Sequence, residues 1–214
     1  MKSPPPGNLS NKPEPAKSVE LDPSRLEFFS DAVLAIVLTI MVLELKVPHG
    51  VDAEALRPLL PVFLSYALSF VYVGIFWGNH HHLMRLHGRV TARVLWANMH
   101  LLFWISLFPF ASGWMGENHY AALPTALYGV VLFAASVAYE LLQQAIIAAQ
   151  GPGSALKVAI GHDWKGKLSL AGYVLGIGAT FLQAWLGQLV FVVVAALWLV
   201  PDRRLERAMR EAGR

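Results

Sequence analysis

The stretch RLEFFSDAVLAIVLTIMVLELKV, residues 25–47, contains the pattern that decides the fold. Its first seven residues include charged and hydroxyl side chains, and the remainder is almost wholly apolar. An apolar run of about 20 residues is what a helix needs to cross the hydrocarbon core of a bilayer. The sequence therefore predicts a transmembrane helix over residues 26–47. We expect Ser24 to cap this helix and the Pro-His-Gly sequence at 48–50 to end it.

Further apolar stretches follow along the chain. Because a single span over 168–200 would overshoot the bilayer, we expect a helical hairpin there, with a tight turn at Gly187. The chain is 56% hydrophobic and only 14% charged, an excess that a soluble domain could not bury. The sequence thus predicts an all-α, polytopic membrane protein with a six-helix bundle over residues 25–202. After the first span, the predicted ones are 56–86, 94–114, 120–149, 168–186 and 188–200.

The two ends of the chain differ from this domain. Residues 1–24 are rich in proline and nearly free of apolar side chains, which predicts a disordered cytoplasmic tail without a signal peptide. Residues 203–214, RRLERAMREAGR, predict a basic cytoplasmic helix extension that rests on anionic lipid. The chain has no cysteine, which excludes disulfides and thiolate metal sites.

The positions of the basic residues predict the orientation. With a cytoplasmic N-terminus, all of the 17 Lys and Arg except Lys46 and Arg57 fall on the inner side. Cytoplasmic segments of membrane proteins are enriched in Lys and Arg, so both termini are expected in the cytoplasm. No basic domain or reading motif is present, and we expect no nucleic-acid partner.

Several polar side chains lie inside the predicted spans. Placing such groups in the hydrocarbon core costs free energy, so their presence indicates a functional or structural role. Alternating helix directions place Asp31, His80, Asn98 and His100 at a similar cytoplasmic depth. This depth predicts one buried polar cluster built from the first three helices. The alternative is that backbone or water satisfies each group separately. Glu140 in the fourth span is a candidate for a second, smaller network.

The histidines at 80–82 invite comparison with a metal site, since imidazole is a common ligand. Consecutive residues on a helix point about 100° apart, so three such side chains cannot converge on one ion. No H-E-x-x-H spacing, G-x-S-x-G elbow, P-loop or carboxylate pair is present. We therefore expect no metal site, no enzymatic activity and no cofactor.

Within the first span, Ile36, Ile40 and Leu43 recur at i, i+4 and i+7 and so form one stripe along one helix face. By pattern alone, such a stripe is typical of ordinary packing or lipid contact.

Three segments together carry a family resemblance: the R-x-x-x-F-S-D sequence at 25–31, FWGNHH at 76–81, and the segment 95–110. With these motifs in place, residues 25–200 resemble prokaryotic members of the transmembrane protein 175 family of potassium channels. The resemblance implies a multi-pass protein of a prokaryotic plasma membrane that forms a homotetramer in the lipid bilayer. It also implies permeant monovalent cations, potassium preferred over sodium, and a pore lined by the first helix of each subunit.

The resemblance also assigns roles to particular residues. A constriction of apolar rings would be formed by Ile36, Ile40 and Leu43, with Thr39 giving a polar ring nearby. A polar network would hold the pore helix, and for Asp31 the expected partners are Arg25, Ser30 and His80. The complete network implied by the resemblance is Arg25, Phe29, Ser30, Asp31, Trp77, His80 and Asn98.

The main alternative is a small secondary or proton-coupled cation transporter, because intramembrane Asp, Glu and His also mark proton relays. Against it, the sequence has no inverted repeat and no matching pair of Gly/Pro-broken helices.

Overall fold

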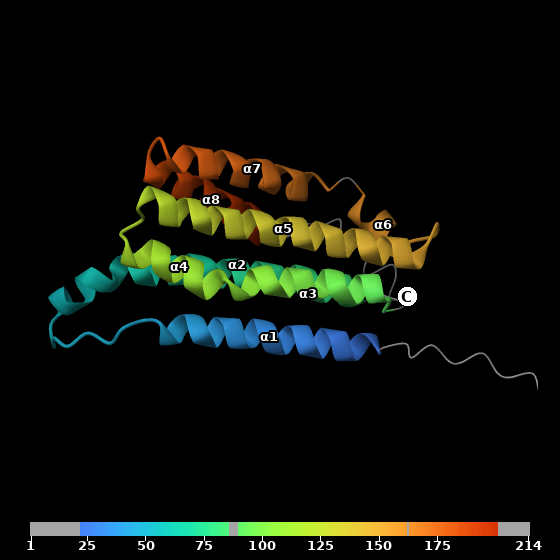
Figure 1. The fold of residues 1–214 in the computed structure, drawn as a ribbon, viewed down its shortest axis with the longest axis horizontal. Helices are drawn as coiled ribbons and strands as arrows, with labels where there is room; N and C mark the ends of the chain where they lie inside the picture. The colour runs from blue at the N-terminus through green and yellow to red at the C-terminus, as the bar shows by residue number, and fades with distance from the viewer. Residues whose placement is uncertain (1–21, 86–89, 162, 201–214) are drawn as a thin grey trace, which may run out of the picture.

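The computed structural model describes residues 22–85, 90–161 and 163–200, and every regular element in these ranges is a helix (Figure 1). The all-α prediction is confirmed for this part of the chain. Residues 1–21 of the tail predicted over 1–24, and the extension predicted over 203–214, lie outside it. The last two residues of the predicted tail belong to the first helix. The elements are α1 Pro23–Leu43, the 3-10 helix η1 Ala53–Leu59, α2 Leu60–Arg85, α3 Ala92–Ser106, α4 Phe108–Glu117, α5 Ala122–Gln150, α6 Ala155–Ile160, α7 Trp164–Thr180 and α8 Ala184–Leu199.

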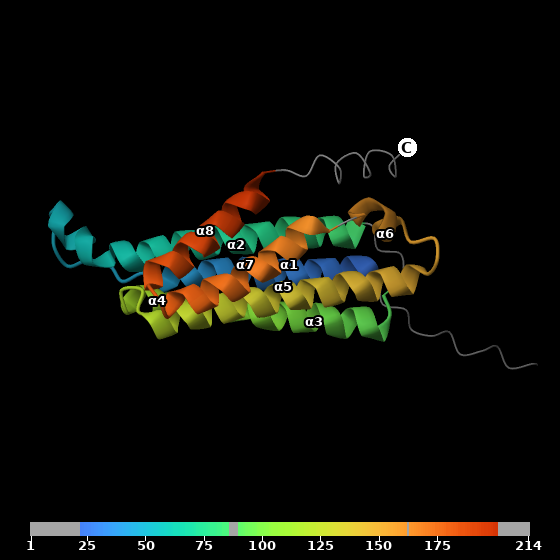
Figure 2. The same cartoon turned by 90° about the horizontal axis from the view of Figure 1, so that it is seen from above.

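The long helices run side by side as a bundle. Viewed from above, α2 and α3 lie on opposite sides, with α1 and α5 between them (Figure 2). In Figure 1, α1 forms one edge of the bundle and the α7–α8 hairpin forms the opposite edge. We call the end at which α1, α3 and α7 begin the proximal end and the other the distal end.

Among the described residues, four helical stretches are long and apolar enough to cross a membrane. The first three contain α1, η1 with α2, and α3 with α4, and the fourth is α5. Helix α8 is also apolar but has only 16 residues, and α7 has 17. The short helix α6 lies between the fourth and fifth predicted spans.

Helix α1 begins earlier than predicted, because Asp22 and not Ser24 is its N-cap. The Asp22 carboxylate accepts a hydrogen bond from the Ser24 backbone N–H at 3.0 Å, and Pro23 occupies the first turn, where its missing N–H does no harm. Hydrogen bonds from Ser24 lower the pKa of Asp22, and the charge of Arg25 acts in the same direction. The helix ends at Leu43, before the Pro-His-Gly sequence.

The third predicted span is not one continuous helix. Helix α3 ends at Ser106, and α4 begins at Phe108 with Pro109 in its first turn. Proline has no N–H to give to the preceding turn, so it is tolerated at a helix start and breaks a helix interior. The span is therefore in the predicted place but is interrupted at Leu107.

The turn between α7 and α8 lies at residues 181–183, so the prediction of a turn at Gly187 is wrong. Gly187 lies inside α8, where a Cβ atom would come within 2.9 Å of the Gly176 backbone oxygen. Small residues let two helices approach closely in a membrane protein. Gly187 therefore allows the close contact between α7 and α8 and does not take part in the turn.

Candidate functional site: the first helix and its polar contacts

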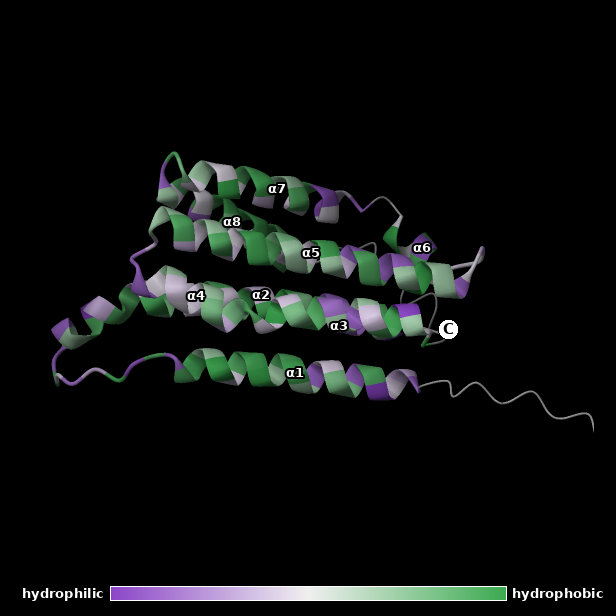
Figure 3. Ribbon diagram, in the orientation of Figure 1, coloured by the Kyte–Doolittle hydropathy of each residue, from purple (hydrophilic) through white to green (hydrophobic). Residues whose placement is uncertain are grey.

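Helix α1 has one face packed against the rest of the chain. Its fully buried residues lie on one side, facing the neighbouring helices α2, α3 and α4. Hydropathy changes along the same helix, from a polar proximal end to an apolar distal half (Figure 3). The buried face comprises Leu26, Ser30, Leu34, Val37 and Met41.

The opposite face of α1 is apolar and exposed in the single chain. Ile36 is 56% exposed, Ile40 43% and Leu43 82%, whereas Val37 on the packed side is 4% exposed. Thr39 is exposed as well, and its hydroxyl donates to the Ile36 carbonyl at 2.9 Å. The residues assigned to the constriction thus share the side of α1 that no helix in the described part of the chain covers.

A buried chain of hydrogen bonds ties α1 to α2 and α3. The Asn98 amide nitrogen donates to Ser30 Oγ at 2.9 Å, and Ser30 Oγ donates to the Leu26 carbonyl at 2.8 Å. His80 Nε2 lies 2.8 Å from Asn98 Oδ1. Because an amide oxygen can only accept, His80 carries a proton on Nε2. Ser30, His80 and Asn98 are all fully buried.

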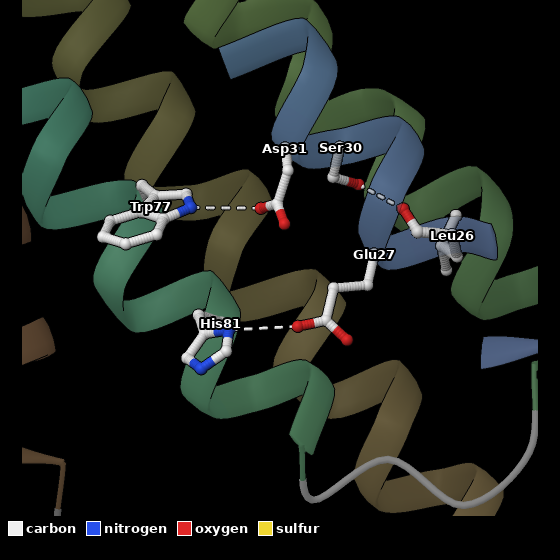
Figure 4. Close-up of polar contacts among 6 residues, drawn as sticks. All are labelled: Leu26, Glu27, Ser30, Asp31, Trp77 and His81. Carbon is white, nitrogen blue, oxygen red and sulfur yellow. Dashed lines mark hydrogen bonds and ion pairs between the residues drawn. The ribbon is translucent and has the colours of Figure 1, made fainter. Parts of the chain in front are cut away.

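A second set of contacts joins α1 to α2 on a more exposed edge, shown in Figure 4. The Trp77 indole N–H donates to Asp31 Oδ1 at 3.1 Å. One turn nearer the proximal end, His81 Nδ1 lies 3.0 Å from Glu27 Oε1. The rings of Trp77 and His81 stack with their centroids 6.2 Å apart.

The expected partners of Asp31 are therefore wrong: its carboxylate bonds to Trp77 and not to Arg25, Ser30 or His80. Ser30 and Asp31 are consecutive, so their side chains point about 100° apart and reach different helices. Arg25 is exposed, and its charge acts on Asp22 just before the helix.

Three further residues lie apart from the buried chain of hydrogen bonds. Phe29 is 48% exposed and lies on the side of the apolar stripe. On α3, His100 Nε2 accepts from the Trp104 indole at 2.9 Å. Glu140 accepts from the Gln144 side chain at 3.2 Å and lines a cavity of about 40 Å³ between α2, α5, α7 and α8.

Sequence reasoning did not identify the contact between Glu27 and His81, although a signal was present. Glu27 precedes Asp31 by four residues, and His81 follows Trp77 by four residues. Residues four apart lie on the same face of a helix. Once Asp31 and Trp77 are paired, Glu27 and His81 must face each other one turn away.

Comparison with known proteins identifies the family. The family model described as endosomal/lysosomal potassium channel TMEM175 matches residues 25–109. A potassium channel of Chryseobacterium sp. (strain P1-3) is 49% identical over 187 residues, which cover 87% of this chain and 97% of that relative. The chain belongs to the TMEM175 family. This membership, together with the apolar helices, makes it a multi-pass membrane protein.

A second relative and a solved structure extend the comparison. A potassium channel of Streptomyces collinus (strain DSM 40733 / Tue 365) is 32% identical over 129 residues, covering 55% of this chain and 61% of that relative. The crystal structure of a lysosomal potassium-selective channel TMEM175 homolog from Chamaesiphon minutus superposes with a TM-score of 0.71 at 24% identity. It covers 83% of this chain and 96% of the crystallised one, and so supports the fold.

Proposed function

We propose that this chain forms a potassium-selective leak channel in the plasma membrane of a prokaryote. Four copies assemble around an axis, and α1 of each copy lines the pore. Ile36, Ile40 and Leu43 form stacked apolar collars, with Thr39 as a polar ring among them. The name of the Chryseobacterium relative, a potassium channel that this chain matches over nearly its whole length, supports the proposal.

The observation that carries the proposal is the two-sided character of α1. Its apolar stripe is exposed, while its other face is fixed by packing and by the buried bonds of Ser30, Asn98 and His80. A helix that only contacts lipid does not need a polar anchor to two neighbours, since lipid tolerates any rotation of an apolar surface. A pore helix does need it, because a small rotation would change which side chains form the constriction.

The collars select potassium through the cost of dehydration. Four isoleucine side chains around an axis leave an opening too narrow for a fully hydrated ion and offer no carbonyl oxygens in exchange for its water. Potassium holds its water less tightly than sodium, so the free-energy cost of removing that water on entering the constriction is smaller for potassium. The same apolar constriction closes the pore when it dewets.

The proposed topology has six membrane spans with both termini in the cytoplasm. At about 1.5 Å per residue, the 16 residues of α8 reach roughly 24 Å, a little short of the ~30 Å hydrocarbon core. The proximal end of the hairpin carries a basic residue: Lys165 Nζ donates to the Val200 carbonyl at 2.8 Å and lies 5.8 Å from the centre of the Trp198 ring. A lysine there agrees with a cytoplasmic proximal end.

The test is ion flux into liposomes that contain the purified protein, with potassium, sodium and caesium gradients compared. We expect Ile36→Asn to keep the channel conducting and to lower the ratio of potassium to sodium flux several-fold, because a polar collar stays wet and binds either ion. Val42→Asn is the matched control, since Val42 is also exposed on α1 but points about 120° away from Ile36. Unchanged selectivity in Ile36→Asn would exclude this collar as the filter.

A proton-coupled cation transporter is the competing function. Unitary currents in planar bilayers distinguish the two, since an alternating-access carrier turns over too slowly to give resolved single-molecule currents. Potassium flux that requires an opposing proton gradient, without such currents, would replace the channel proposal.

A further inference from the structure

We propose that Glu44 concentrates cations at the distal, extracellular mouth of the pore. The inference rests on the proposed function, in which four copies of α1 surround the axis. Glu44 is the C-cap of α1 and directly follows Leu43, the outermost collar residue. Consecutive helical residues point about 100° apart, so Glu44 faces α4 and not the axis. In the tetramer, the four Glu44 carboxylates would lie around the entrance just outside the apolar constriction, each set back from the axis on the α4 side of its helix.

Glu44 is held against the wall of the bundle by a contact with α4. A Cβ atom at Gly113 would lie only 2.8 Å from Glu44 Oε2, so the carboxylate occupies the space that a side chain would fill. The residue as a whole is exposed, and one of its carboxylate oxygens is tucked against a helix backbone. The charge is thus kept close to the end of α1 and does not extend freely into solvent.

The neighbouring charges leave Glu44 uncompensated. Lys46 Nζ bonds to Glu117 Oε1 at 2.7 Å, so the nearest lysine is already paired with another carboxylate. Within the described ranges, no basic side chain forms an ion pair with Glu44. The three side chains of Glu44, Lys46 and Glu117 together carry one net negative charge per subunit.

The surroundings also make this charge sensitive to external pH. Partial burial, and then the negative charge of Glu117, raise the pKa of the Glu44 carboxyl above its usual range. Lys46 stays charged throughout, because its bond to Glu117 raises the pKa of that ammonium group. As external pH falls, Glu44 therefore takes up a proton earlier than an ordinary glutamate, and the attraction for cations is lost.

Negative charge at the pore mouth changes the local concentration of cations and not the selectivity between potassium and sodium. Its field reaches about 10 Å at 0.1 M salt and about 3 Å at 1 M. It therefore raises the local concentration of potassium and sodium alike, and only at low ionic strength. This behaviour separates the role of Glu44 from that of the collars.

The experiment records inward potassium current in planar bilayers at about 20 mM and about 1 M salt. We expect Glu44→Gln to lower the current roughly two- to tenfold at low salt. At high salt, and in the ratio of potassium to sodium permeability, it should match the wild type. Glu54→Gln is the matched control: it removes one carboxylate per subunit from η1, where Glu54 is exposed and pairs with Arg57 at 3.7 Å.

A second variant tests the charge in a channel that is already folded and conducting. Because the chain has no cysteine, Glu44→Cys introduces a unique thiol. A sulfonate-bearing thiol reagent added outside should raise the low-salt current, and a trimethylammonium-bearing one should lower it.

Three results would overturn the proposal. The first is an equal response to both reagents, and the second is a low-salt current in Glu44→Gln equal to that in Glu54→Gln. The third is a wild-type protein that passes no potassium, which would also remove the proposed function.

Discussion

At the scale of single residues, the Asn98 side chain on α3 forms hydrogen bonds with two neighbouring helices. Its amide oxygen accepts from His80 on α2, and its amide nitrogen donates to Ser30 on α1. The Ser30 hydroxyl in turn donates to the Leu26 carbonyl. The Asn98 amide thus links α1, α2 and α3 through hydrogen bonds. In a setting without water, such bonds are strong when complete and costly when one member is missing.

We therefore expect Asn98→Ala to destabilise the protein by about 1–3 kcal/mol, because Ser30 and His80 both lose their partner in a buried site. The measurement is the midpoint of thermal unfolding of the purified protein in detergent. Ser106→Ala on the same helix is the control, since Ser106 is exposed and bonds only to the nearby Phe103 carbonyl. Equal midpoints for the two variants would show that the buried bonds add nothing.

The residue scale also shows where sequence reasoning stopped. His80 and Asn98 were predictable as neighbours because alternating helices place them at one depth, and the family resemblance added Ser30 to the same network. Depth does not fix rotation about the helix axis, and so Asp31 was assigned to the wrong partners. Only the packed structure shows that Asp31 faces the Trp77 indole on another edge.

At the scale of elements, helices α2 and α4 are in close contact at Gly116. A Cβ atom there would lie 2.7 Å from Val62 Cα and 3.2 Å from the Pro61 carbonyl oxygen. Both atoms belong to the backbone, so no side chain can rotate aside to make room. The two helices would have to move apart.

Gly116→Ala should accordingly destabilise the protein by about 1–3 kcal/mol through overpacking. Alanine forms helix better than glycine by about 1 kcal/mol, so the strain must exceed that gain. Gly178→Ala in α7 is the matched control, because a Cβ atom at Gly178 meets nothing within 4 Å. We expect this control to unfold at the wild-type temperature or above it, and a Gly116→Ala protein that behaves like the control would contradict the close contact.

The elements themselves were predictable to very different degrees. Apolar runs locate the spans because a bilayer demands length and hydrophobicity, and both can be read from composition. Ends and breaks depend on local packing: the turn at 181–183 is Phe-Leu-Gln, which carries no turn signal, whereas Gly187 carries one and lies within a helix. The interruption at Leu107 could have been anticipated from Pro109.

At the scale of the whole molecule, the position of α1 at the edge of the bundle decides which face can meet other copies (Figure 1). The opposite edge, formed by the α7–α8 hairpin, also exposes apolar residues, among them Leu182 at 78% and Leu175 at 69%. Exposure alone therefore does not separate a pore-lining face from one that meets lipid. The distance between subunits does separate them. If α1 lines the pore, residues on the α1 edge of neighbouring subunits lie close together, and residues on the hairpin edge lie far apart.

Cross-linking tests this directly, because the chain has no cysteine of its own. Leu43→Cys and Leu182→Cys each place one exposed thiol near the distal end, the first on the stripe of α1 and the second in the turn of the hairpin. A short bifunctional maleimide added to membranes should join Leu43→Cys subunits into dimers, since four such side chains would lie around one axis. Leu182→Cys subunits should stay monomeric on a denaturing gel, because the hairpin would lie at the periphery against lipid. If Leu182→Cys subunits cross-link and Leu43→Cys subunits do not, the assembly is built on the opposite edge, and α1 cannot be the helix that lines the pore.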